Sequence, residues 1–152
     1  MNEHLDFRWM HGQRITEVSE TSGVYWRFSL SACGSITAEC LWRLIRDGRI
    51  AVTGEDHGQQ FGLPAPVDAV SRVTSLLADA AITRIEIREG TADLIIHFDL
   101  PFRLEFIATS CGYESWQITA SDGSSVVAAS GSQVCYAPPV EESRVVTMIP
   151  IP

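Results

Sequence analysis

The sequence predicts an α+β domain in which two repeated antiparallel β-meanders flank one amphipathic helix, with the helix packed on the sheet. The first observation is a strict alternation of apolar and polar residues in short runs, which places apolar side chains on one face of each strand. The second is that this pattern occurs twice, once on each side of a single helix-like segment. The third is that segment itself, whose apolar residues recur at spacings of three and four.

The repeat can be followed along the chain in the order in which its strands are expected. Each half begins with an Ile-Thr pair, continues through two alternating runs and ends on a tryptophan. The first half carries Ile15-Thr16-x-Val18, Trp26-x-Phe28-x-Leu30, Ile36-x-Ala38 and Trp42, and the second carries Ile82-Thr83-x-Ile85-x-Ile87, Ile96-x-Phe98-x-Leu100, Leu104-x-Phe106-x-Ala108 and Trp116. The pattern therefore predicts that the two tryptophans are counterparts in packing.

The expected strands are separated by short glycine-containing turns, which supply the positive φ that a tight connection often needs. In the first meander they are Arg14–Ser19, Val24–Leu30, Ser35–Cys40, Leu41–Ile45 and Arg49–Thr53. In the second they are Ile82–Arg88, Asp93–Asp99, Phe102–Thr109, Tyr113–Ala120, Ser125–Ala129 and Gln133–Tyr136. Whether the two meanders form one continuous sheet or two packed sheets is left open by the sequence.

One helix is expected, over Pro66–Ala80. Proline suits the first helical position because its missing N–H is not needed there, and Asp68 in the first turn favours the helix dipole. The stripe that must be buried consists of Val70, Val73, Leu76, Leu77 and Ala80. The surface available to cover this stripe is the sheet that the meanders build.

The length of 152 residues fits a single domain, 1–152. Residues 1–10 are expected to be a loosely attached lead-in, although Phe7, Trp9 and Met10 could cover an edge of the core. Residues 138–152 are expected to be a tail that begins at Pro138-Pro139. Val145–Ile149 could form a terminal strand, but the ending Pro150-Ile151-Pro152 favours the tail.

Composition limits the classes of partner and the cellular compartment. Four scattered cysteines without a CxxC pair favour reduced thiols, although their even number also permits disulfides. The acidic N-terminus is unlike a signal peptide, so a cytoplasmic location is expected. A net charge of −8 disfavours nucleic-acid binding, because an acidic surface repels the phosphate backbone. The candidate basic patch, at Arg43, Arg46 and Arg49, is more typical of a solvated turn. No apolar run is long enough for a membrane span.

Two stretches resemble a family of small bacterial domains of unknown function. The first is Asp56-His57-Gly58-Gln59-Gln60-Phe61-Gly62-Leu63-Pro64-Ala65-Pro66-Val67-Asp68-Ala69. The second is Ser110-Cys111-Gly112-Tyr113-Glu114-Ser115-Trp116, which is similar to a Gly-Tyr-Glu-x-Trp signature. The resemblance covers most residues from Gly12 to Tyr136 and implies no established activity. Some comparable small bacterial domains are immunity proteins that neutralise toxins, which makes an immunity-like role one expectation.

The loop before the helix holds the main candidate site, at Glu55, Asp56 and His57. Two carboxylates and an imidazole could bind a metal or act in acid–base chemistry. The other interpretation is that Asp56 caps a turn while His57 bonds to the backbone. We expect no metal and no cofactor, and predict that this loop, with Gln59, binds a partner.

Tyr113 and Glu114 are the second group of candidate binding residues. If Tyr113–Ala120 is one alternating strand, Glu114 and Trp116 share one face, with Trp116 in the core and Glu114 near the rim. Packing of Trp116 against the core is the favoured interpretation, and a ligand pocket is the alternative.

The sequence favours a non-catalytic protein-binding module, in its specific form an immunity-like bacterial protein that neutralises a basic partner. The alternative is a small-molecule-binding protein or hydrolase that uses Glu55, Asp56 and His57. Neither a nucleophile elbow nor a phosphate-binding glycine loop occurs, which weighs against an enzyme without deciding the matter. Homo-oligomerisation through an open sheet edge, at Ile82–Ile87 or Leu94–Phe98, is compatible with both functions.

Overall fold

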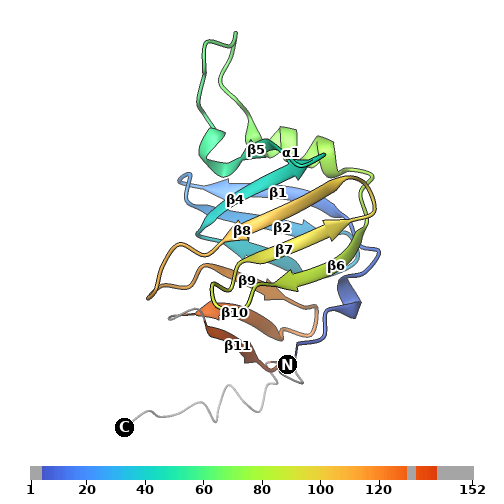
Figure 1. Cartoon of the computed structure of the whole chain (residues 1–152). Coiled ribbons are helices and arrows are strands. Elements are labelled where there is room, and N and C mark those ends of the chain that lie inside the picture. Colours follow the sequence, from blue (N-terminus) through green and yellow to red (C-terminus); the bar gives the residue numbers. More distant parts are fainter. Residues whose placement is uncertain (1–4, 130–132, 140–152) are drawn as a thin grey trace.

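The computed structural model describes residues 5–129 and 133–139. Two antiparallel sheets face one another, one with the strand order β1-β2-β3-β9-β10-β11 and the other with the order β5-β4-β8-β7-β6 (Figure 1). The strands are β1 (Ile15–Thr21), β2 (Tyr25–Leu30), β3 (Ser35–Ala38), β4 (Leu41–Arg46), β5 (Arg49–Thr53), β6 (Ile82–Ile87), β7 (Leu94–Phe98), β8 (Phe102–Ile107), β9 (Trp116–Thr119), β10 (Ser125–Ala129) and β11 (Gln133–Ala137). The predicted α+β class is confirmed, with a low helix content.

Each half of the chain contributes to both sheets, which answers the question that the sequence leaves open. The first half places β1-β2-β3 in the six-stranded sheet and then crosses over to supply β4 and β5 to the other. The second half places β6-β7-β8 in the five-stranded sheet and crosses back to supply β9, β10 and β11. Strands β1 to β5 therefore occupy the same topological places as strands β6 to β10.

The repeat extends to individual hydrogen bonds. The Arg14 backbone N–H donates to the Ser31 side chain, and the Ala81 N–H donates in the same way to Asp99, each at 2.9 Å. In return, the backbone N–H of Ser31 donates to Arg14 and that of Asp99 donates to Ala81. The pairs β1–β2 and β6–β7 also share a register shift at the same place, after Ile15 and after Ile82. The sequence repeat is thus a repeat of structure.

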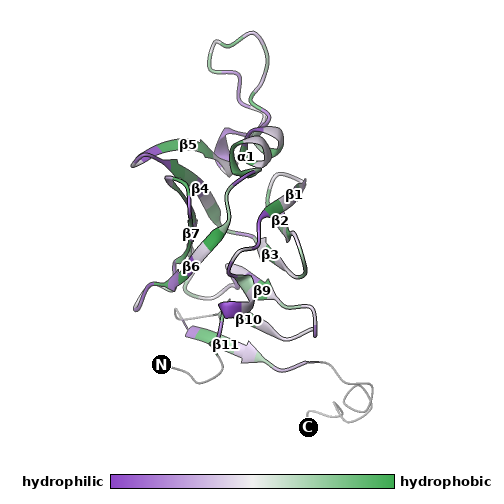
Figure 2. Ribbon diagram, turned by 90° about the vertical axis from the view of Figure 1, so that its right-hand side faces the viewer, coloured by the Kyte–Doolittle hydropathy of each residue, from purple (hydrophilic) through white to green (hydrophobic). Residues whose placement is uncertain are grey.

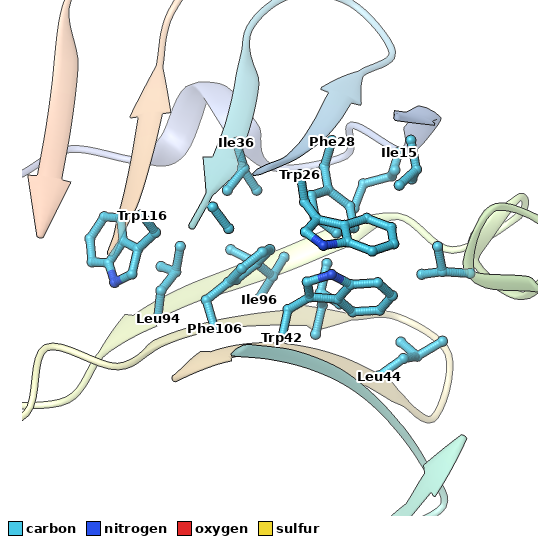
Figure 3. Close-up of a cluster of buried hydrophobic side chains, with 14 of the residues drawn as sticks. Ile15, Trp26, Phe28, Ile36, Trp42, Leu44, Leu94, Ile96, Phe106 and Trp116 are labelled. Carbon is cyan, nitrogen blue, oxygen red and sulfur yellow. The ribbon is translucent and has the colours of Figure 1, made fainter. Parts of the chain in front are cut away.

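The core lies between the sheets, where the predicted apolar faces meet. Phe28 of β2 contacts Trp42 of β4 and Phe106 of β8 edge to face, with ring centroids 5.4 Å and 5.3 Å apart. Trp26 packs against Trp42 in the same manner, at 4.9 Å. Figure 3 shows these rings between the two sheets, with Trp116 buried further along the same layer.

The helix α1 (Ala69–Leu77) is shorter than predicted at both ends. Asp68 is the N-cap rather than a first-turn residue, because its side chain accepts a hydrogen bond from the Ser71 N–H at 3.1 Å. Pro66 therefore lies in the preceding loop. The helix contacts the edge strands β1 and β5, so it packs between the sheets at one end of the molecule (Figure 2).

Two expectations about the ends and edges of the fold need revision. Residues 5–10 are not loose: Arg8–Met10 form a 3-10 turn, and Met10 is completely buried. Strand β7 is not an edge, because it lies between β6 and β8, and only β6 of the two suspected strands has a free side. Residues 140–152, including the proposed strand at Val145–Ile149 and most of the expected tail, lie outside the described residues. No helix in the described part of the chain could span a membrane.

Candidate functional site

The segment that connects the two halves of the repeat forms a loop that projects beyond the body of the molecule. It runs from the 3-10 turn η2 (Gly54–Asp56) to the start of α1, and we call residues 57–68 the projecting loop (Figure 1). The two sides of the base of this loop are joined by backbone hydrogen bonds from Gly58 N to Val67 O and from Val67 N to Gln59 O, each 2.8 Å long. The loop is thus held as an ordered hairpin-like structure.

Asp56 and His57 hold the base of this loop in place. The Asp56 carboxylate accepts the backbone N–H of Thr53 at 2.9 Å, while the Thr53 hydroxyl accepts that of Asp56, which completes a capping box. The His57 Nδ1 accepts the N–H of Ala69 at 3.1 Å, and its Nε2 lies 3.9 Å from a carboxylate oxygen of Glu20. These bonds agree with the interpretation in which Asp56 caps a turn and His57 bonds to the backbone.

The tip of the loop presents apolar side chains to solvent. Phe61 is 68% exposed and Leu63 is 49% exposed. Gln60 to Leu63 form a tight turn, closed by a 2.7 Å hydrogen bond from Leu63 N to Gln60 O. Its central residues both have positive φ, 50° at Phe61 and 76° at Gly62. A bulky residue such as phenylalanine is rare in this conformation, which costs about 1–2 kcal/mol relative to glycine.

The same pair of positive φ angles occurs in two other turns, which makes a comparison possible. The turn between β1 and β2 uses Ser22-Gly23, and the turn between β4 and β5 uses Asp47-Gly48. Aspartate tolerates the left-handed conformation because its short side chain can bond locally. Of these three turns, only the projecting loop has a large apolar residue at the strained position.

Glu55 and Gln59, the other predicted residues of this region, have exposed side chains. Tyr113 and Glu114 do not lie in a strand as predicted, because β9 begins only at Trp116. They belong instead to a turn in which the Ser110 hydroxyl accepts the backbone N–H groups of Gly112 and Tyr113. The alternation argument for Glu114 therefore fails, although Trp116 is buried as predicted.

A cavity of about 250 Å³ lies beside η2, between the β1–β2 turn and the link from β3 to β4. Its lining includes Val24, Glu39, Trp42, Gly54 and Glu55. Tyr113 is not part of it, and Glu114 instead lines a separate, smaller cavity that also contains Glu39. Glu39 connects these two regions, and it was missed because nothing in the sequence placed it near either one.

The indole nitrogen of Trp42 is the unusual atom at this cavity. Trp42 is completely buried, and its N–H has no hydrogen-bond partner among the residues that the structure describes. A buried donor without an acceptor costs about 1–3 kcal/mol. Trp116, the counterpart in the repeat, donates to the backbone carbonyl of Ala92 at 2.8 Å. The repeat in the sequence predicted this pair, but not the difference between its members.

Metal binding and thiol chemistry find little support in the described residues. They contain no group of three or more His, Cys, Asp and Glu side chains that could hold a metal ion. Cys40, which lines the cavity, is buried, and burial raises the pKa of its thiol to about 12. A neutral thiol is a weak nucleophile. Cys111 and Cys135 are free and exposed.

Comparison of the chain with protein families, with curated proteins and with solved structures gave no match.

Proposed function

We propose that this protein is a non-catalytic protein-binding module and that the projecting loop carries the main contact with the partner. The observation that supports this most is Phe61, a large apolar side chain held in solvent by a turn whose backbone conformation disfavours it. Strained backbone of this kind concentrates at functional positions because folding alone gives no reason to retain it. A smaller or more polar residue would suit the isolated turn better.

The geometry of the loop fits the role of a binding anchor. Aromatic side chains that enter a pocket of a partner supply much of the affinity of protein interfaces. The hydrogen bonds across the base of the loop and the supports at Asp56 and His57 fix the tip before binding, so that less conformational entropy is lost on association. Leu63 extends the apolar surface beside Phe61.

The charge of the chain favours a basic partner. The net charge is −8, and the exposed Glu55 lies directly before the projecting loop. Opposite charges accelerate encounter and fix orientation, while the buried anchor supplies affinity. An immunity-like role, in which the partner is a basic toxin, is the specific form of this proposal.

A small-molecule-binding or hydrolytic use of Glu55, Asp56 and His57 is the alternative. The Asp56 Oδ2 and the His57 Nδ1 already hold the loop, through the capping box and the bond from Ala69 N, so chemistry through these two atoms would break that support. The protein-binding proposal requires no such change, and the observations favour it for this reason.

The test is affinity capture at low salt from cells that express the protein naturally, with wild type, Phe61→Ala and Ile50→Ala compared side by side. Ile50 is also a largely exposed apolar residue, but it lies on β5 away from the loop tip, so it is the matched control. We expect the Phe61 substitution to weaken capture of the same protein by about 30-fold, or about 2 kcal/mol. The Ile50 substitution should leave it unchanged.

The salt dependence tests the electrostatic part of the proposal. The captured protein should be basic and should dissociate as salt rises from about 50 to about 500 mM. Undiminished capture by the Phe61 variant would overturn the assignment of the loop, and a salt-insensitive complex would overturn the assignment of a basic partner.

A further inference from the structure

The two halves of the repeat differ at one buried hydrogen bond, and the difference coincides with a cavity. In the second half, the β6–β7 turn folds over Trp116: Ala92 is only 2% exposed, and its carbonyl accepts the indole N–H at 2.8 Å. In the first half, the residue at the corresponding place before β2 is Val24, which is 66% exposed. The cavity beside Trp42 is lined by Val24 of this turn.

The lengths of the two turns explain the difference. Residues 21–25 separate Glu20 from Trp26, whereas residues 88–93 separate the matching residues Ile87 and Leu94, one residue more. The additional residue, with Ala92 at a positive φ of 62°, lets the longer turn bend back to the indole. The shorter turn closes with a bond from Val24 N to Thr21 O and leaves the Trp42 N–H without an acceptor.

We propose that a short basic segment of the protein partner occupies this cavity. A backbone carbonyl of that segment accepts the Trp42 indole N–H, in the way that the Ala92 carbonyl accepts that of Trp116. An arginine or lysine side chain beside that carbonyl pairs with Glu39 and Glu55, which line the same cavity from two different links and are both exposed. This inference rests on the proposed function, because it names the chemistry of the partner at the base of the projecting loop.

Gly54 controls access to the indole nitrogen. A Cβ placed on Gly54 would lie only 2.6 Å from the Trp42 Nε1. Glycine is therefore required for the present packing, and its backbone lies against the donor that the ligand must reach. For a ligand to reach the N–H, the turn η2, which is anchored through Asp56 and carries Glu55, has to move outward. Binding would thus move the base of the projecting loop.

The test uses the intact protein and two short peptides, acetyl-Ala-Arg-Ala-amide and acetyl-Ala-Glu-Ala-amide. The indole N–H signals of the four tryptophans are followed by ¹H–¹⁵N NMR, and the Trp42 signal is assigned by its loss in Trp42→Phe. We expect the arginine peptide to move the Trp42 signal downfield in a saturable way, while the Trp116 signal, already bonded to Ala92, stays in place. The glutamate peptide should move neither.

Variants connect this shift to the cavity. Gly54→Ala should abolish it by filling the space at the nitrogen. Since that variant could also unfold, a folded and more decisive variant is the pair Glu39→Gln and Glu55→Gln, which should weaken peptide binding by about three- to tenfold. Glu17→Gln is the matched control because Glu17 is an exposed glutamate on β1 outside the cavity.

An immobile Trp42 signal with the arginine peptide, or an equal response to both peptides, would overturn the inference. So would unchanged binding by the double glutamine variant. Failure of this inference can be distinguished from failure of the proposed function. Loss of partner capture in Phe61→Ala together with an unchanged Trp42 signal would support the loop as the partner contact and would rule out the cavity as a binding site. A shift of the Trp42 signal together with undiminished capture by Phe61→Ala would support the cavity as a binding site and would rule out the loop as the main partner contact.

Discussion

The two halves of this chain have the same strand topology, but they differ in what surrounds it. Where they agree, the residues are those of the core: Trp42 and Trp116 occupy matching places, as do Leu44 and Ile118. Where they differ, the first half leaves a buried hydrogen-bond donor without an acceptor among the described residues. The β1–β2 turn leaves the Trp42 N–H unpaired, whereas the β6–β7 turn satisfies Trp116.

Positions that match between the two halves serve the fold, and features found in one half alone are candidates for function. Matching positions are explained by the need to bury apolar surface between two sheets. Only residues 130–132 separate β10 from β11, so the second half has no segment of the projecting loop's length at the matching place. The cavity lined by Trp116 is smaller, at about 70 Å³ compared with about 250 Å³ beside Trp42. Both features lie at the same end of β5 and share the turn η2. Features that break an internal repeat are therefore the first places to test for binding.

The largest expected difference between the halves is in the loss of unfolding free energy when matching residues on the outer faces of the two sheets are substituted. Glu105 of β8 is only 1% exposed and accepts hydrogen bonds from Arg43 at 2.6 Å and Arg103 at 3.0 Å. The matching position on β3 is Thr37, which pairs with Gln117. We expect Glu105→Ala to lower the free energy of unfolding by about 2–4 kcal/mol, because two arginines lose their shared carboxylate. Thr37→Ala should change it by less than about 0.5 kcal/mol.

Urea unfolding of the two variants, followed by tryptophan fluorescence, measures this contrast. The ratio of the two losses in unfolding free energy is the decisive quantity. Equal losses would show that the charged network contributes no more than a neutral polar pair.

The same carboxylate makes stability depend on pH. Burial alone would raise the pKa of Glu105, but the hydrogen bonds from Arg103 and Arg43 outweigh it, and the pKa lies below its usual value. A lowered pKa in the folded state contributes stability above the unfolded pKa of about 4.3, and this contribution is lost as pH falls through the folded value. Glu105→Gln should therefore be less stable than wild type at pH 7, by about 1–2 kcal/mol, with a smaller gap near pH 3. A gap that does not change with pH would contradict this assignment.

The next contrast is between the matched tryptophans. Both are almost fully buried, but only Trp116 has a partner for its N–H. Replacement by phenylalanine removes a satisfied hydrogen bond at Trp116 and strands the Ala92 carbonyl, whereas at Trp42 it removes an unsatisfied donor. We expect Trp116→Phe to cost about 1–2 kcal/mol more than Trp42→Phe in urea unfolding. Equal costs would show that the Trp42 N–H is satisfied in solution, for example by water.

Much of this fold follows from the sequence because apolar periodicity is a local signal. The expected strands Arg49–Thr53 and Ser125–Ala129 match β5 and β10 to the residue, and the pairing of Trp42 with Trp116 in the repeat is reproduced by the register. The helix prediction was too long because Pro66 and Asp68 were both read as helical, whereas Asp68 caps the helix. Tyr113–Ser115 were predicted as strand, but β9 begins only at Trp116, and the Ser110 hydroxyl organises a turn at Gly112 and Tyr113.

The candidate site was less accessible to sequence reasoning because it depends on contacts between distant residues. The sequence identified the loop with Asp56 and His57 but could not show that Thr53 and Ala69 already use their polar atoms. The prominence of Phe61 depends on its φ, which no pattern reveals. Glu39 joins Glu55 only because the crossover from β3 to β4 passes beside η2.

The smallest predicted effect tests whether Phe61 is retained for binding, by comparing its turn with that of Asp47-Gly48. Phe61→Asn places in the left-handed position a residue that tolerates it. The exposed phenylalanine makes little packing contribution, so we expect the variant to raise the free energy of unfolding by about 0.5–1 kcal/mol. The reverse change at the other turn, Asp47→Phe, should lower it by at least as much. Urea unfolding gives both values, and affinity capture shows whether the stabilised Phe61 variant has lost its partner. A more stable protein that still binds would mean that Phe61 serves neither folding nor recognition. A less stable Phe61→Asn variant would mean that Phe61 packs against other residues in solution. Contacts within the chain would then offset the backbone strain at this turn, and Phe61 would no longer support the assignment of the loop tip as the binding anchor.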